Sequence, residues 1–308
     1  MKPRAALLAI VFVLSGLAGA QPEPAAAQAP PAQAHFRVSL TGIRCNTATI
    51  DNVVSIDGAG DEVFALSKIV ELTATNTIAA TTVRESLTYG DTTGRSSPAG
   101  IAFALDHGPS RIHAGTASRT GGMRAGDVIP DPAVTPTPNR SRALRARVIP
   151  MILWEGQLRR GGEAPNAVVI VPTIWELDNI PVLRPVWDAQ LDGYLRRVAA
   201  GSALIRNAPR PLVNQSDTVM QWSPSRNDFD RPIGMTGGAF NPAAATPELA
   251  TFVPVVLFLT FDSAQEAASS IARNSRGRPG VIEIRYKDGP NYGPGDYTVT
   301  LQIERLSG

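Results

Sequence analysis

Several segments of the chain either alternate apolar and polar residues with a period of two or form runs of β-branched and aromatic residues, patterns that predict β-strands. Between Tyr297 and Ile303 the alternation is complete, so one face of that strand is expected to be buried. Phe36 to Ile43 has a similar pattern. Further runs of this kind occupy residues 62–73, 83–89, 145–158, 168–177, 252–261 and 281–286.

Two pairs of these strands are separated by short polar segments, which indicates hairpins. Residues 159–163 join the runs at 145–158 and 168–177, and residues 287–296 join the last two runs of the chain. We therefore expect each pair to form neighbouring antiparallel strands.

Helical spacing of apolar residues occurs twice. From Pro185 to about Arg206, apolar residues recur on one face, which predicts a helix that covers the core. A second helix is predicted from Ser263 to Ala272, where Ser263 and Glu266 have the spacing of a capping box.

Many short strands with Gly- and Pro-rich turns and only two helices favour a mainly β fold. We expect an antiparallel β-sandwich, C2-like or Ig-like in outline, with two helical insertions. Residues 35–308 are interpreted as one domain with long loops, and a split near 127–142 is the alternative. The expected loops are at 91–100, 127–139 and 209–246.

The N-terminus has the three parts of a secretory signal peptide. Lys2 and Arg4 precede an apolar run that ends at Leu17, and Ala18-Gly19-Ala20 is a small-residue cleavage site. We expect residues 1–20 to be removed, with Ala34 as a second choice of site, and the Ala-, Pro- and Gln-rich residues 21–34 to be disordered. The protein is then exported to a periplasm or the extracellular space without a transmembrane anchor, and its Ala, Arg and Pro usage is typical of bacterial exported proteins.

The net charge limits the classes of partner that we expect, and the cysteine content limits the interactions that can stabilise the fold. The formal net charge is +2, and removal of Lys2 and Arg4 leaves the mature chain close to neutral, which argues against nucleic acid as a partner. Cys45 is the only cysteine, so an intramolecular disulfide is excluded, and we expect a small buried side chain there.

Sequence motifs for catalysis are few, so the enzyme question stays open. There is no Gly-x-Ser-x-Gly string, no phosphate-binding loop, no His-Glu-x-x-His and no Cys-x-x-Cys. The three histidines are His35, His107 and His113, and the spacing of the last two suits loop residues better than a metal site.

Acidic residues gather between the first two predicted strands and around the last turn. The first group is Asp51, Asp57, Asp61 and Glu62, and the last turn is bracketed by Asp288 and Asp296. Calcium prefers such oxygen ligands, so the first group is a candidate calcium site; an ordinary turn is the alternative. The segment from Asp57 to Phe64, an acidic turn that leads into a strand, resembles the first calcium loop of C2-type sandwiches. The second acidic cluster that this resemblance implies is represented only by Asp262.

Aromatic residues in polar segments are candidates for ligand contact, because flat rings stack on sugars or on a protein partner. These residues are Trp222, Phe229 and Tyr292, and packing of the loop on the domain is the alternative. The sequence favours an exported, non-enzymatic β-sandwich that binds a protein or carbohydrate through its end loops. The alternative is a secreted hydrolase that uses Asp or Glu side chains from separate strands.

Overall fold

The computed structural model describes most of the chain after residue 32. The described residues are 33–49, 60–90, 111–117, 121–131, 141–160, 165–177, 183–200, 212–214, 220–222, 231–237, 250–252, 254–270, 277–290 and 293–307. Contacts divide the chain into Met1–Pro31 and a compact unit, Ala32–Gly308, to which all described residues belong.

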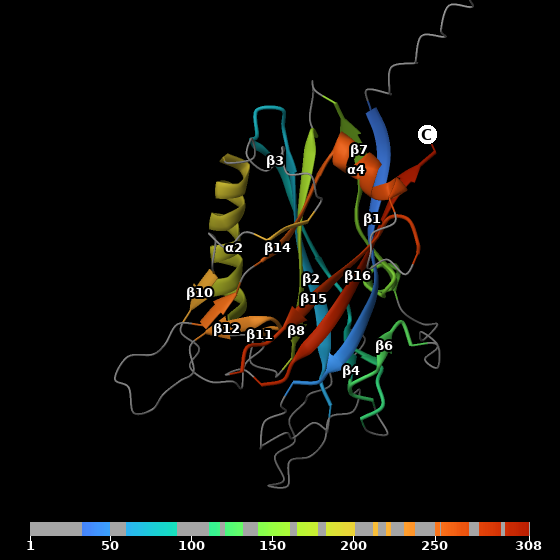
Figure 1. The fold of residues 1–308 in the computed structure, drawn as a ribbon, viewed down its shortest axis with the longest axis vertical. Coiled ribbons are helices and arrows are strands. Elements are labelled where there is room, and N and C mark those ends of the chain that lie inside the picture. The colour runs from blue at the N-terminus through green and yellow to red at the C-terminus, as the bar shows by residue number, and fades with distance from the viewer. Residues whose placement is uncertain are drawn as a thin grey trace, which may run out of the picture. The chain divides into compact units, whose positions relative to one another are not determined.

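A five-stranded antiparallel sheet is built on the long strand β1 (Gln33–Thr47). One edge of β1 pairs with β16, and β16 in turn pairs with β15 (Figure 1). The other edge pairs with β7 along its first half and with β6 near its end. The bounds of these partners are β6 Val128–Ile129, β7 Met151–Arg159, β15 Val281–Lys287 and β16 Asp296–Leu306.

A second, eight-stranded sheet is centred on β2 and β8, which pair along their whole length. All its pairings are antiparallel except the one between β4 and β5. Its strands are β2 Val63–Leu72, β3 Ile78–Glu85, β4 Thr88–Gly90, β5 Arg111–His113, β8 Ala167–Glu176, β9 Leu212–Asn214, β11 Arg231–Pro232 and β14 Val255–Thr260. A small third sheet consists of β10 Met220–Trp222, β12 Met235–Gly237 and β13 Ala250–Phe252.

The two larger sheets pack against each other through alternate residues of their strands. On β16, Tyr297, Val299, Leu301 and Ile303 are buried while the residues between them are partly exposed. Hydrogen bonds also cross between the sheets: the Trp154 indole donates to Glu71 at 2.8 Å, and the Tyr286 hydroxyl donates to the Pro172 carbonyl at 2.6 Å. The expected mainly β fold is confirmed, with strand pairings that are antiparallel except for the parallel pair β4 and β5.

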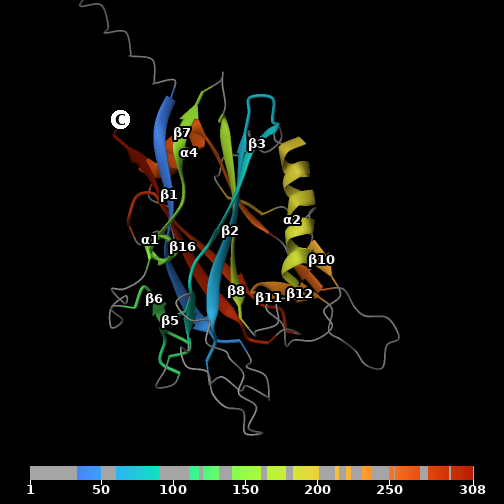
Figure 2. The same cartoon turned by 180° about the vertical axis from the view of Figure 1, so that it is seen from behind.

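Helix α2 (Leu183–Ala200) covers the opposite face of the eight-stranded sheet (Figure 2). Its Trp187 ring meets the Trp175 ring of β8 edge-on, with 5.3 Å between centroids. Every residue of β8 is therefore buried, because the strand lies between the other sheet and this helix. Among the described residues, no helix has both the length and the apolar character needed to cross a membrane.

Helix α4 (Phe261–Ser269) packs on β14, β16 and β1, where its Phe261 meets Phe36 edge-on. Its capping box uses Thr260 and Ser263, so the expected box of Ser263 and Glu266 is wrong: the helix begins earlier, directly at the end of β14. A short helix, α1 (Arg142–Arg145), ends where the strand was expected to start, and turns over residues 146–150 delay the strand until Met151.

The hairpin expected between 145–158 and 168–177 is also wrong. Strand β7 pairs with β1, whereas β8 pairs with β2 and β14 in the other sheet. The physical reason is burial on both faces of β8, which places this apolar run at the centre of the larger sheet. The final hairpin, β15 with β16, is confirmed.

Candidate functional site: a buried ionic network at the strand ends

Charged and polar side chains are buried where several strands of the two large sheets end together. We call this group the strand-end network. Its members are Thr49, Asp61, Glu62, Arg111, Glu176, Arg231, Asp288 and Tyr297, all of them buried. They follow β1 and β15, precede β2, and belong to β5, β8, β11 and β16.

Arg231 joins two carboxylates at the centre of the network. Its Nη2 lies 3.2 Å from Glu176 Oε2, and its Nη1 lies 2.9 Å from Asp288 Oδ2. The other oxygen of Asp288 accepts backbone N–H bonds from Gly234 at 2.7 Å and Met235 at 3.0 Å. The Arg231 side chain is only 5% exposed, so both ion pairs are shielded from water.

A second buried ion pair connects Arg111 with Glu62, with 3.1 Å between Nη2 and Oε1. Gly90 lies directly against this pair: its φ is +152°, and a Cβ there would be 2.8 Å from Glu62 Cγ. A larger residue at position 90 would therefore displace the Glu62 carboxylate.

Asp61 is held by neutral donors. Its Oδ2 accepts the Thr49 backbone N–H at 2.7 Å and the Tyr297 hydroxyl. The Thr49 hydroxyl donates to Glu176, so Thr49 connects Asp61 with the Arg231 group. Asp61 Oδ1 is buried and has no hydrogen-bond partner among the described residues.

Among the described residues, three of the buried carboxylates in the network pair with Arg111 or Arg231, whereas Asp61 has only neutral donors. Burial raises the pKa of Asp61, against the lowering effect of its hydrogen bonds. Burial likewise raises the pKa of Asp288, although Arg231 opposes this. Burial and the neighbouring Asp61 raise the pKa of Tyr297. Burial therefore favours the protonated forms of Asp61, Asp288 and Tyr297 more than water does.

Asp296 lies at the rim of this region, and its pKa is shifted in the opposite direction. The Arg285 guanidinium, which is largely exposed, donates to its carboxylate, and Asn46 adds a bond of 3.0 Å. The bond from Arg285 lowers the pKa of Asp296. Asp288 and Asp296, which bracket the last turn in sequence, thus have different environments.

Network residues flank the connections that leave this end of the sheets. Residues 50–59 run between Thr49 and Asp61, and residues 91–110 run from Gly90 to Arg111. Residues 223–230 lead into Arg231. Glu176 and Asp288 precede the connections that contain 178–182 and 291–292. The network therefore fixes the ends of connections that come from distant parts of the sequence.

Two residues of the predicted calcium site, Asp61 and Glu62, belong to the network, and Asp51 and Asp57 lie outside the described residues. The described part of the chain contains no group of three or more His, Cys, Asp or Glu side chains arranged to hold a metal ion. Glu62 pairs with Arg111, and calcium binding by this group stays a prediction.

Of the predicted ligand-contacting aromatic residues, Trp222 ends β10, and Phe229 and Tyr292 lie outside the described residues. Trp222 and Phe229 fall beside or within the connection that ends at Arg231. Tyr292 falls within the connection between Asp288 and Asp296. Sequence reasoning missed Arg111, Glu176 and Arg231 as site residues. The one local signal was Glu176, an acidic residue at the end of a long apolar strand.

Cys45 is fully buried beside Tyr297, which confirms the expected small buried side chain. Burial raises the pKa of its thiol to about 12, so the thiol is neutral at physiological pH. A nucleophilic role for Cys45 is therefore unfavourable.

Comparison of the chain with protein-family models, with curated proteins and with solved structures found no match in any of the three. The geometry described above is consequently the basis for a functional argument.

Proposed function

We propose that this protein is an exported β-sandwich that binds a carbohydrate through the connections at the strand-end network. The signal-peptide pattern of residues 1–20 supports export. Two mainly antiparallel sheets with facing apolar sides support a sandwich with the general outline of C2-like or Ig-like domains.

The observation that carries this proposal is the burial of ion pairs at the ends of the connections. Removing charges from water is costly, and apolar packing of equal volume often gives more stability. Buried hydrogen-bonded charges have directional preferences, however, so they hold the connection ends in defined positions. Binding residues are commonly placed on loops that a rigid scaffold positions.

The aromatic residues in these connections suggest the chemistry of the ligand. Trp222, Phe229 and Tyr292 come from two connections that both end at members or neighbours of the network. Aromatic rings that come from different loops can stack on the flat faces of sugar rings. A carbohydrate fits this composition better than nucleic acid does, given the nearly neutral mature chain.

The alternative, a hydrolase, would need carboxylates that a substrate can reach. Asp61, Glu62, Glu176 and Asp288 are each no more than 6% exposed, and all except Asp61 form ion pairs with Arg111 or Arg231. These four residues are therefore better suited to holding structure than to acid–base catalysis.

A glycan array probed with the mature protein tests the proposal. We expect binding to a subset of glycans, and loss of at least about tenfold in signal for a variant with Trp222→Ala, Phe229→Ala and Tyr292→Ala, because stacking area is removed. Val83→Ala with Ile152→Ala is the matched control, since these exposed apolar residues lie on β3 and β7. The control should bind as the wild type does.

A panel of glycosidase, esterase and peptidase substrates distinguishes the two functions. The binding proposal expects no turnover. Turnover that disappears when a single Asp or Glu is replaced would establish the hydrolase instead, and an array signal that is unchanged in the triple aromatic variant would refute binding through these connections.

A further inference from the structure

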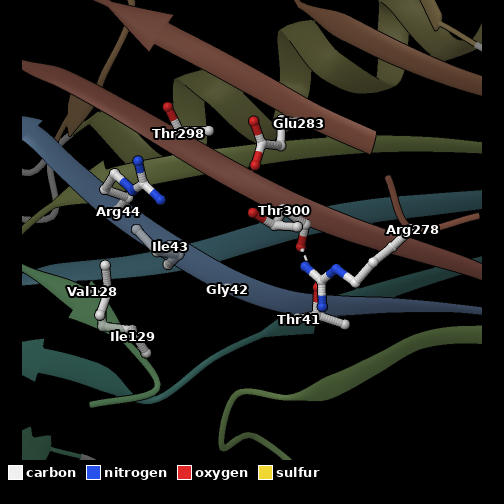
Figure 3. Close-up of a pocket in the computed structure, with 10 residues that line it drawn as sticks. All are labelled: Thr41, Gly42, Ile43, Arg44, Val128, Ile129, Arg278, Glu283, Thr298 and Thr300. Atoms are coloured by element: carbon white, nitrogen blue, oxygen red, sulfur yellow. Dashed lines mark hydrogen bonds between the residues drawn. The ribbon is translucent and has the colours of Figure 1, made fainter. Parts of the chain in front are cut away.

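A small polar pocket lies on the outer face of the five-stranded sheet, on the side of β1 and β16 that faces away from the core (Figure 3). Its volume is about 150 Å³. Strands β1, β6, β15 and β16 contribute most of its lining: Thr41, Gly42, Ile43, Arg44, Val128, Ile129, Glu283, Thr298 and Thr300, with Arg278 from the segment before β15. At about 30 Å³ per water, it holds roughly five waters or one small molecule.

The floor of this pocket is formed by an irregularity in β1. The register between β1 and β16 shifts between Leu40 and Gly42, so Thr41 is an extra residue on β1. The Thr41 hydroxyl donates to the Thr300 carbonyl at 3.2 Å, which fixes the bulge. A Cβ at position 42 would be 3.1 Å from the Ile129 carbonyl, so glycine allows β6 to approach closely. Bulges of this kind commonly redirect side chains at functional sites.

Arg44, Arg278 and Glu283 are the charged residues in the described part of the pocket lining. Arg44 and Arg278 form no ion pair with any residue that the structure describes, in contrast to Arg37 on the same sheet face, which pairs with Glu155 at 2.7 Å. Figure 3 shows Arg278 reaching over the sheet toward Thr41 and Thr300, with Arg44 at the other side of the hollow. Glu283 lies near the pocket's upper edge in that view.

We propose that this pocket binds a small organic acid that also carries hydroxyl groups. The ligand's carboxylate is held by Arg44 and Arg278, because guanidinium groups donate paired hydrogen bonds to carboxylates. Its hydroxyls donate to Glu283, the acidic side chain among the described residues of the lining. The threonine hydroxyls, which both donate and accept, complete the contacts.

This site is separate from the carbohydrate-binding connections proposed above. Its polar side chains come from the five-stranded sheet and the segment before β15, whereas the strand-end network is buried where strands of the two large sheets end. Failure of one proposal therefore leaves the other unaffected, and a measurement that reports individual residues distinguishes them.

Titration of the ¹⁵N-labelled mature protein with glucuronate, followed by backbone amide NMR shifts, tests the proposal. We expect shifts that saturate in the millimolar range and that concentrate at residues 41–44, 128–129, 278–283 and 298–300. Glucose, which lacks the carboxylate, should leave these amides unmoved. Inorganic phosphate should bind more weakly than glucuronate, because it cannot place several hydroxyls near Glu283.

Variants then separate the contributions of the charges. Arg44→Gln with Arg278→Gln should weaken glucuronate binding at least tenfold, whereas Arg37→Gln, on the same strand and face, should leave it unchanged. Glu283→Gln should weaken binding of glucuronate but not of phosphate. If the wild type and the double arginine variant bind glucuronate with equal affinity, the proposed binding site is wrong. If the wild type binds phosphate and glucuronate with equal affinity, the proposed recognition of hydroxyl groups is wrong. A melting curve for each variant confirms that the fold is retained.

Discussion

At the scale of single residues, the raised pKa values of Asp61 and Asp288 link the stability of the strand-end network to pH. Burial raises the folded-state pKa of Asp61 above its ordinary value of 3.8. The folded protein then binds this proton more tightly than the unfolded chain does. The contribution of Asp61 to stability is therefore complete below pH 3.8 and is lost as the pH rises through the folded-state pKa.

Asp61→Asn removes this titration and keeps an oxygen that accepts from Thr49 and Tyr297. We expect the stability of the variant relative to the wild type to increase with pH above about 4, by at most about 1.4 kcal/mol per pH unit. Urea unfolding at a series of pH values measures this difference. A difference that stays constant with pH would contradict a raised pKa.

Asp296→Asn is a useful contrast, because Arg285 lowers the pKa of Asp296. The stability from Asp296 is present above its unfolded-state pKa and is lost as the pH falls through the lower folded-state pKa. We expect the stability of this variant relative to the wild type to fall as the pH rises toward about 4 and to stay constant above that pH, opposite in sign to the trend for Asp61→Asn. Urea unfolding at the same series of pH values measures this change. If the relative stabilities of the two variants change with pH in the same direction, the environments of Asp61 and Asp296 are not distinct.

Arg231 is the residue whose loss should disturb the network most. Arg231→Ala leaves Glu176 and Asp288 buried without their cation, which costs about 3–5 kcal/mol of unfolding free energy. Arg37→Ala, at a partly exposed ion pair with Glu155, should cost at most about 1 kcal/mol. Denaturant unfolding of both variants checks the prediction. Equal losses would mean that Arg231 has no special role.

At the scale of elements, a buried charge lies in the contact between α2 and the eight-stranded sheet. Lys68 of β2 lies under the helix with its side chain 7% exposed, and it pairs with Asp192, whose side chain is 46% exposed. The aromatic contacts of Trp187 with Trp175 and Phe252 hold the same helix. Apolar packing therefore positions α2, and the ion pair compensates for the burial of the lysine.

Asp192→Ala and Lys68→Met distinguish these roles. Removing Asp192 leaves the Lys68 ammonium buried without a partner, so this variant should be the less stable of the two. Lys68→Met replaces the charge with an apolar chain of similar length and should change stability little, or increase it. Thermal unfolding of both variants provides the comparison. A larger loss for Lys68→Met would indicate that the ion pair itself is stabilising.

At the scale of the whole molecule, calcium binding by Asp51, Asp57, Asp61 and Glu62 predicts a change in overall stability. Free calcium at about 100 times its dissociation constant would add roughly 2.7 kcal/mol by mass action. Magnesium should add less, because it prefers a stricter octahedral shell. Melting curves with EDTA, calcium and magnesium, repeated for Asp61→Asn, provide the measurement. An unchanged midpoint would mean that the pairing of Glu62 with Arg111 is sufficient without a metal.

Export predicts a change in the chain itself. If residues 1–20 are a signal peptide, the protein isolated from its native host begins at Gln21. Intact mass measurement or N-terminal sequencing determines the first residue. A product that retains Met1 would contradict export by this route.

Strand positions could be read from the sequence because alternation reflects local burial on one face. Residues 297–303 were identified in this way and lie within β16, and residues 281–286 were identified likewise and lie within β15. Sheet membership could not be read in the same way. Strand β8 follows β7 in sequence but pairs in the other sheet, because a strand that is apolar on both faces is most stable at the centre of a covered sheet.

For the candidate site, the sequence showed that acidic residues gather near Asp61 and around the last turn, since proximity along the chain is visible in it. The pairing of those residues depends on the tertiary structure. Arg111 and Arg231 reach Glu62 and Asp288 only because strands from distant segments end at the same place. An ion pair of this kind has no local signature: the strength of the attraction and the cost of desolvation both depend on burial, and burial is a property of the folded chain.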